Sequence, residues 1–208
     1  MNSDQRKEMV EIAHQLSHGN TGNFSIRVDD GFMITPTGAA NNDLEEDQIV
    51  LMSRDGETRA DQRKPSSEWR FHRDLYATRK DVNAIIHTHS TYATVLACLQ
   101  REIPPFHYMI AEAGGDTIRC ADYATFGTQE LSDNIIVAMT DRKACLMANH
   151  GMLVVGESLK KSRDLFYLVE ELSRQYVLAL QIGTPVILSQ QEMAINIEKF
   201  KHYGKQND

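Results

Sequence analysis

The sequence lacks several features, and each absence excludes a class of protein. No apolar run approaches the roughly 18 residues of a membrane-spanning helix, and residues 1–8 lack the apolar core of a secretion signal. Basic residues form no cluster and the formal net charge is −7, so neither nucleic acid nor a membrane is an expected partner. The 3 cysteines are far apart without a Cys-x-x-Cys motif, which indicates reduced thiols and a cytoplasmic protein.

Signatures of nucleotide binding and of interdomain linkers are missing as well. No glycine pattern matches the Walker or Rossmann motifs, and no repeat or Gly/Ser/Pro-rich segment divides the chain. The composition is that of an ordinary globular protein, with 41% hydrophobic and 25% charged residues in a chain of 208. We therefore predict one domain over residues 1–208, with a sizeable core.

Hydrophobic periodicity predicts consecutive strands at the start and in the middle of the chain, with helices between and after them. Strands are expected at 24–28, 31–35, 49–52, 82–86, 144–147 and 152–155. Helices are expected at 9–16 (ending near Gly19), 67–78 (capped by Ser66 or Ser67), 92–99, 130–139 and 165–180. This order favours a mostly antiparallel sheet flanked by helices.

The most informative motif is His87-Thr88-His89, which closes an apolar strand. Side chains two residues apart on a strand point to the same face, so the two imidazoles form half of a zinc-type site. The alternative interpretation is a pair of solvated histidines on an edge strand. A third histidine, His150, also ends an apolar run. Three imidazoles leave one coordination position open, as in catalytic zinc sites.

Carboxylate and hydroxyl groups stand near this predicted metal site. Glu68 is the carboxylate best placed to work beside a metal. His72 lies four residues later on the same helix face and could orient this carboxylate, although a buried structural role is expected. The loops 19–23 and 35–38 and the pair Ser66-Ser67 are rich in small residues, hydroxyls and amides. Together they could bind a phosphate through neutral donors, although each alone is also typical of a turn or a helix cap.

These motifs resemble those of the class II aldolase/adducin-head family. The matching stretches are 22–25, 34–38, 65–72, 87–89, 107–111, 123–128, 150–151 and 199–204. The resemblance implies an α/β fold, a three-layer α/β/α sandwich around a central, mainly antiparallel sheet. It also implies a homotetramer with active sites between subunits.

The resemblance assigns roles to individual residues. It implies one zinc ion per subunit on His87, His89 and His150, with Glu68 as the base and as a possible fourth ligand. The other implied roles are proton donation by Tyr108 of a neighbouring subunit, phosphate binding (Asn23, Thr37, Gly38, Ser66 and Ser67) and the aldehyde side of the site (Phe126 and Tyr203).

The implied activity is a retro-aldol reaction. A ketose 1-phosphate of the L-fuculose 1-phosphate type is cleaved reversibly to dihydroxyacetone phosphate and a short aldehyde of the lactaldehyde type, through an enediolate that zinc stabilises. Manganese and cobalt remain alternatives to zinc, because imidazoles accept several divalent ions.

Other functions of the same fold stay open. An aldolase for 5-deoxyribulose or 5-methylthioribulose 1-phosphate would share the quoted motifs. A methylthioribulose-1-phosphate dehydratase is a further alternative, and so is a pentulose-5-phosphate 4-epimerase, in which an aspartate usually replaces Glu68. A non-enzymatic adducin-like module would have lost metal ligands, whereas all three histidines and Glu68 are present.

Overall fold

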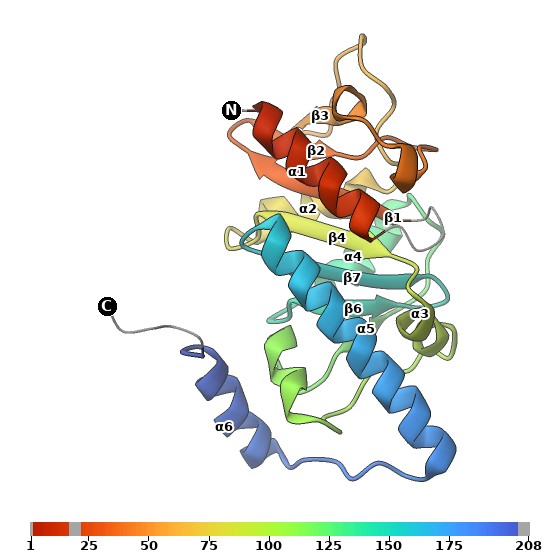
Figure 1. The fold of residues 1–208 in the computed structure, drawn as a ribbon, viewed down its shortest axis with the longest axis vertical. Helices are drawn as coiled ribbons and strands as arrows, with labels where there is room; N and C mark the ends of the chain where they lie inside the picture. Colours follow the sequence, from red (N-terminus) through yellow and green to blue (C-terminus); the bar gives the residue numbers. More distant parts are fainter. Residues whose placement is uncertain (1, 17–21, 204–208) are drawn as a thin grey trace.

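A single seven-stranded sheet forms the centre of the molecule, with helices on both of its faces (Figure 1). The structure, a computed structural model, describes residues 2–16 and 22–203. The strand order is β3-β2-β1-β4-β7-β6-β5, and within the described residues every neighbouring pair is antiparallel except β5 and β6. The predicted α/β class with a mainly antiparallel sheet is confirmed.

The elements have the following bounds. The strands are β1 (Gly22–Val28), β2 (Gly31–Ile34), β3 (Val50–Ser53), β4 (Ala84–Thr88), β5 (Arg119–Ala121), β6 (Ala144–Met147) and β7 (Gly151–Gly156). The α-helices are α1 (Asn2–Gln15), α2 (Trp69–Thr78), α3 (Thr91–Cys98), α4 (Gln129–Ala138), α5 (Leu159–Ile182) and α6 (Gln190–Phe200). Short 3-10 helices are η1 (Asn41–Asp43), η2 (Glu46–Gln48) and η3 (Tyr108–Ala113). No helix in the described ranges is long and apolar enough to cross a membrane.

Alternating side chains of the strands pack into two separate hydrophobic cores, one on each face of the sheet. Ile86 of β4 packs into the core under α1, α3 and α5, whereas its neighbour Ile85 packs into the core under α2 and α4. Both isoleucines are fully buried. Figure 1 shows α1 and α5 in front of the sheet and α2 and α4 behind it. The odd-numbered positions of β4 therefore face α2, and this parity decides where His87 points.

Several predicted boundaries were wrong. Helix α2 begins at Trp69 with Glu68 at the cap position, and Ser66 lies just outside it, where its hydroxyl accepts a hydrogen bond from the backbone N–H of Glu68. Helix α5 begins at Leu159 because the Ser158 hydroxyl accepts a hydrogen bond from the backbone of Lys161. The predicted end of the first helix near Gly19 and the loop residues 19–21 lie outside the described residues.

Five of the described elements were not predicted: η1, η2, η3, β5 and α6. Helix α6 had a readable signal, because Ser189 and Glu192 form a reciprocal capping box at its start. Its buried face is small, and Met193 is the one fully buried residue among those described in it. This small apolar face explains why periodicity alone did not reveal the helix.

Candidate active site

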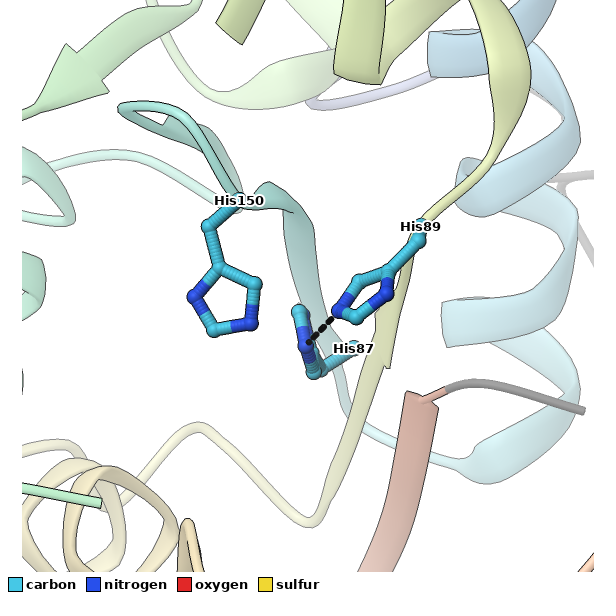
Figure 2. Close-up of side chains that lie close together, drawn as sticks. All are labelled: His87, His89 and His150. Carbon is cyan, nitrogen blue, oxygen red and sulfur yellow. Dashed lines mark hydrogen bonds between the residues drawn. The ribbon is translucent and has the colours of Figure 1, made fainter. Parts of the chain in front are cut away.

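The three predicted histidines lie together at one end of the sheet (Figure 2). His87 lies near the end of β4 and His89 directly follows that strand, while His150 precedes β7. Because β4 and β7 are antiparallel neighbours with Thr88 opposite Met152, the end of one strand meets the start of the other. One nitrogen from each ring lies within 4.8 Å of the others, so the group could hold a metal ion.

A tight turn between β6 and β7 allows this approach. Asn149 adopts a left-handed conformation with φ 54°, a region that asparagine tolerates better than most residues. Gly151 follows, and a Cβ atom there would lie 2.4 Å from the Thr88 carbonyl oxygen and 2.9 Å from the His89 ring. Only glycine therefore lets the two strand ends bring His89 and His150 together.

A backbone carbonyl fixes the orientation of the His87 ring. His87 is completely buried, and its Nδ1 lies 2.9 Å from the carbonyl oxygen of Met152. A carbonyl oxygen can only accept, so Nδ1 carries a proton, and Nε2 is the nitrogen directed toward the cluster. Nε2 of His87 lies 3.1 Å from Nε2 of His89 and 3.3 Å from Oε2 of Glu68.

Glu68 contributes a buried carboxylate to the same cluster. Its Oε2 accepts a 2.9 Å hydrogen bond from the Asn23 amide, whereas Oε1 has no hydrogen-bond partner among the described residues. Oε1 lies 3.4 Å from Nε2 of His150. Burial raises the pKa of Glu68, but its interactions with His87, His150 and Asn23 outweigh burial and lower that pKa to about 2. The carboxylate is therefore ionised at neutral pH.

The cluster has the donor chemistry of a divalent metal site. Burial and the nearby His87 lower the pKa values of His89 and His150 to about 4, despite the opposing effect of Glu68. Both rings are therefore neutral at pH 7, the form in which imidazole ligates a metal. Three converging imidazoles beside a carboxylate oxygen that has no hydrogen-bond partner among the described residues fit a divalent ion such as zinc.

Backbone pairing gathers the predicted phosphate-binding segments beside Glu68. The backbone N–H of Thr37 donates to the Lys64 carbonyl, and that of Ser66 donates to the Thr35 carbonyl. Thr35 in turn is bonded to Phe24, the residue after Asn23. Ser67, Thr37 and Gly38 are exposed, whereas Asn23 and Ser66 are buried. These segments thus form one wall next to the carboxylate.

The predicted aldehyde-side aromatics occupy two different places. Phe126 is exposed, and the next residue, Gly127, lies against the predicted phosphate segment, because a Cβ atom built on Gly127 would lie 2.8 Å from the Ser67 carbonyl oxygen. Tyr108 and Tyr203 are exposed and pack around Phe200 of α6, with ring centroids 6.1 and 5.6 Å from it. Figure 1 shows α6 on the side of the molecule opposite to the end of β4, so this chain does not bring these tyrosines to its own histidine cluster.

Sequence reasoning missed a buried hydrogen-bonded group behind Glu68. His72 is fully buried, as expected, but it contacts Asn23 and Ser25 rather than Glu68. The signal was present as a stripe of Glu68, His72 and Tyr76, spaced by four residues along one helix face. It faces the alternate residues Asn23 and Ser25 of β1.

Comparison with known proteins identifies the family. Residues 8–177 match the family described as Class II Aldolase and Adducin N-terminal domain. The chain belongs to the class II aldolase family.

Among its relatives, a 5-methylthioribulose-1-phosphate/5-deoxyribulose-1-phosphate aldolase of Rhodospirillum rubrum is 51% identical, over 96% of this chain and 92% of that protein. An L-fuculose phosphate aldolase of Escherichia coli is 45% identical, over 95% of this chain and 91% of that protein. A solved structure of L-fuculose 1-phosphate aldolase superposes with a TM-score of 0.92 at 41% identity, covering 96% of this chain and 97% of that one. The class II aldolase fold is thus shared along nearly the whole chain.

Proposed function

We propose that this class II aldolase is a metal-dependent lyase that reversibly cleaves a ketose 1-phosphate to dihydroxyacetone phosphate and a short aldehyde. The observation that carries the proposal is the buried, ionised Glu68, whose Oε1 has no hydrogen-bond partner among the described residues and lies next to three converging imidazoles. The similarity to aldolases named for phosphorylated sugars points to the same chemistry.

The metal in this proposal is zinc, held by His87, His89 and His150, with Glu68 within reach as a further ligand in the absence of substrate. Bound there, zinc would act as a Lewis acid that polarises the ketose oxygens and stabilises the negative charge of the enediolate. His87 is held for this task by the Met152 carbonyl, which keeps its Nε2 lone pair directed into the cluster.

Glu68 is the proposed base. It handles the proton of the enediolate carbon, because it is ionised at neutral pH and has one oxygen without a hydrogen-bond partner in the described structure. Tyr108 of a neighbouring copy is the proposed proton donor at the aldehyde oxygen. In one chain Tyr108 lies on η3 beside α6, so this role requires the proposed homotetramer with sites between subunits.

The phosphate of the substrate is proposed to bind through neutral donors. Its proposed ligands are Asn23, Thr37, Gly38, Ser66 and Ser67, which lie on segments joined by backbone hydrogen bonds. Ser66 and Ser67 directly precede the N-terminal end of α2, where free backbone N–H groups favour an anion. Phe126 and Tyr203 are proposed to border the aldehyde half of the substrate, Tyr203 from a neighbouring copy.

Two substrate types are the candidates. The sequence motifs lead us to propose L-fuculose 1-phosphate or a similar ketose. The 51% identity to the Rhodospirillum rubrum enzyme, against 45% to the Escherichia coli fuculose enzyme, favours 5-deoxyribulose or 5-methylthioribulose 1-phosphate as the second candidate.

A cleavage assay on ketose 1-phosphates that differ at C5 tests both the reaction and the substrate. The zinc-loaded protein is mixed with each ketose, and release of dihydroxyacetone phosphate is followed by its enzymatic reduction. We expect release from at least one ketose, and no release with the H89A variant. Loss of water without release would indicate a dehydratase, and a change of configuration at C4 without release would indicate an epimerase. Either result refutes the aldolase proposal.

A further inference from the structure

A continuous row of buried polar groups runs from Glu68 into the core between β1 and α2. Nδ2 of Asn23 donates to Glu68 at 2.9 Å, and Oδ1 of the same amide lies 2.5 Å from Nε2 of His72. Nδ1 of His72 lies 2.6 Å from the Ser25 hydroxyl, which lies 2.8 Å from the Tyr76 hydroxyl. All five side chains are buried, and His72 and Ser25 have no exposed surface.

The orientation of the Asn23 amide gives this row its direction. Its NH₂ group faces Glu68 and its Oδ1 faces His72, and in an amide the NH₂ donates whereas the oxygen accepts. Oδ1 is an acceptor, so Nε2 of His72 must carry a proton. The opposite direction would place the Asn23 oxygen against the Glu68 carboxylate, two acceptors at hydrogen-bond distance in a dry environment.

The remaining groups complete the same direction. Burial lowers the pKa of His72 to about 3, so the ring is neutral and its Nδ1 accepts from the Ser25 hydroxyl. Burial also raises the pKa of Tyr76, which keeps the phenol protonated and able to donate to Ser25. Each group therefore donates to the next, from Tyr76 through Ser25, His72 and Asn23 to Glu68. The Phe71 ring stacks on the His72 ring, with 4.5 Å between the ring centroids, and so restricts the movement of His72.

We propose that His72 is a positioning residue of this active site, which holds the Asn23 amide with its NH₂ group toward Glu68 and so keeps the carboxylate directed at the histidine cluster. The inference rests on the proposed function for the catalytic role of Glu68. The direction of the hydrogen bonds does not depend on that function and is measurable without a substrate.

The first test is the tautomer of His72 in the full-length protein. Nitrogen-15 NMR of histidine-labelled protein distinguishes a protonated from an unprotonated ring nitrogen, and the H72Q variant identifies the His72 signals among the 8 histidines. The spectrum is recorded at neutral pH with zinc bound and again after removal of zinc. We expect a proton on Nε2 and none on Nδ1 in both states. A proton on Nδ1 alone would overturn the proposal, whether or not the protein cleaves any ketose.

The second test compares two substitutions that each keep half of the His72 hydrogen bonds. In H72Q the amide NH₂ replaces Nε2 and still donates to Asn23, whereas in H72N the shorter amide reaches only the position of Nδ1, near Ser25. We expect kcat of H72Q to stay within about threefold of the wild-type value. We expect H72N to lose about 10- to 100-fold, the range found for groups that orient active-site ligands.

A matched control separates positioning from general destabilisation. Ser162 is a fully buried serine that donates to the Ala84 carbonyl, at the end of β4 away from His87. S162A removes a buried hydroxyl, as S25A does, but should keep kcat within about twofold while S25A lowers it. Equal activity of H72Q and H72N, or equal effects of S25A and S162A, would show that the row is only structural. If H72N does not fold, the tautomer measurement and the serine pair still decide the question.

Discussion

Replacing Glu68 by glutamine separates the chemistry of this carboxylate from its shape. In E68Q the amide oxygen can still accept from Asn23, and the NH₂ group takes the place of Oε1, which has no hydrogen-bond partner to lose among the described residues. We therefore expect the variant to fold with little change in melting temperature. What it lacks is a basic oxygen and the negative charge near His87 and His150.

The expected loss follows from the role of a general base. Positioned bases typically contribute 10²- to 10⁴-fold, so E68Q should slow proton exchange about 100-fold or more, equivalent to roughly 2.7 kcal/mol of activation free energy. The direct assay is NMR of dihydroxyacetone phosphate in D₂O, which follows the loss of one C3 proton signal. This half-reaction needs no aldehyde, so its rate does not depend on which ketose is the substrate or on the residues near Tyr203.

Two controls make the result interpretable. Zinc content is measured for each protein, because loss of the metal would also stop exchange. The E170Q variant is the matched substitution, since Glu170 accepts hydrogen bonds from Ser90, Tyr92 and Ala93 at the start of α3 and takes no part in the histidine cluster. E170Q should exchange at the wild-type rate. Exchange by zinc-loaded E68Q within threefold of the wild-type rate would refute the assignment of Glu68 as the base.

Three further predictions concern the metal, the phosphate and pH. H89A should lose stoichiometric zinc, measured by atomic emission, and cleave no ketose while the fold persists; retained zinc with normal activity would contradict the three-histidine site. S67A should raise KM for the phosphorylated ketose about tenfold and leave the zinc content unchanged. Tenfold is the lower end of the loss expected for a hydrogen bond to a charged group, because Ser67 is exposed. An equal loss on a non-phosphorylated ketose would exclude a phosphate contact. Folding lowers the pKa of His72 from 6.5 to about 3, so between pH 6.5 and pH 3 the unfolded chain binds a proton that the folded protein does not. The free energy of unfolding therefore decreases as the pH falls through this range. Urea unfolding should show a decrease from pH 7 to pH 4 that is roughly 3 kcal/mol larger for the zinc-free wild type than for zinc-free H72Q, and parallel pH profiles would contradict this.

Strong local patterns predicted much of the fold and of the site. The alternation of β1, the apolar run before His87 and the stripe of α5 each bury enough surface to be readable in the sequence, and all were confirmed as elements. The histidine cluster was predicted because His87 and His89 stand two residues apart at the end of one apolar run and His150 ends another. The three rings come together because Gly151 lies close to Thr88. This contact could not be predicted without knowing that β4 pairs with β7.

What could not be predicted depends on contacts between segments far apart in the chain. The serines before α2 look like helix caps, but backbone hydrogen bonds to Thr35 hold that segment, and Glu68 takes the cap position instead. The link from Glu68 to His72 passes through Asn23, 49 residues before His72. A one-dimensional pattern shows the stripe on α2 but not the β1 residues that it meets.

The place of β4 in the sheet has a consequence for how the protein moves. β4 is the fourth of seven strands and is paired on both edges, so we expect its amide hydrogens to exchange with solvent more slowly than those of the edge strands. Two of the three proposed ligands lie on or directly after this strand, and the third directly precedes the neighbouring strand β7. We therefore expect the proposed metal site to lie in a part of the molecule that rarely opens. The exposed Phe126 and helix α6, in which Met193 is the buried residue, have less packing to lose, so we expect any adjustment to a substrate there rather than at β4.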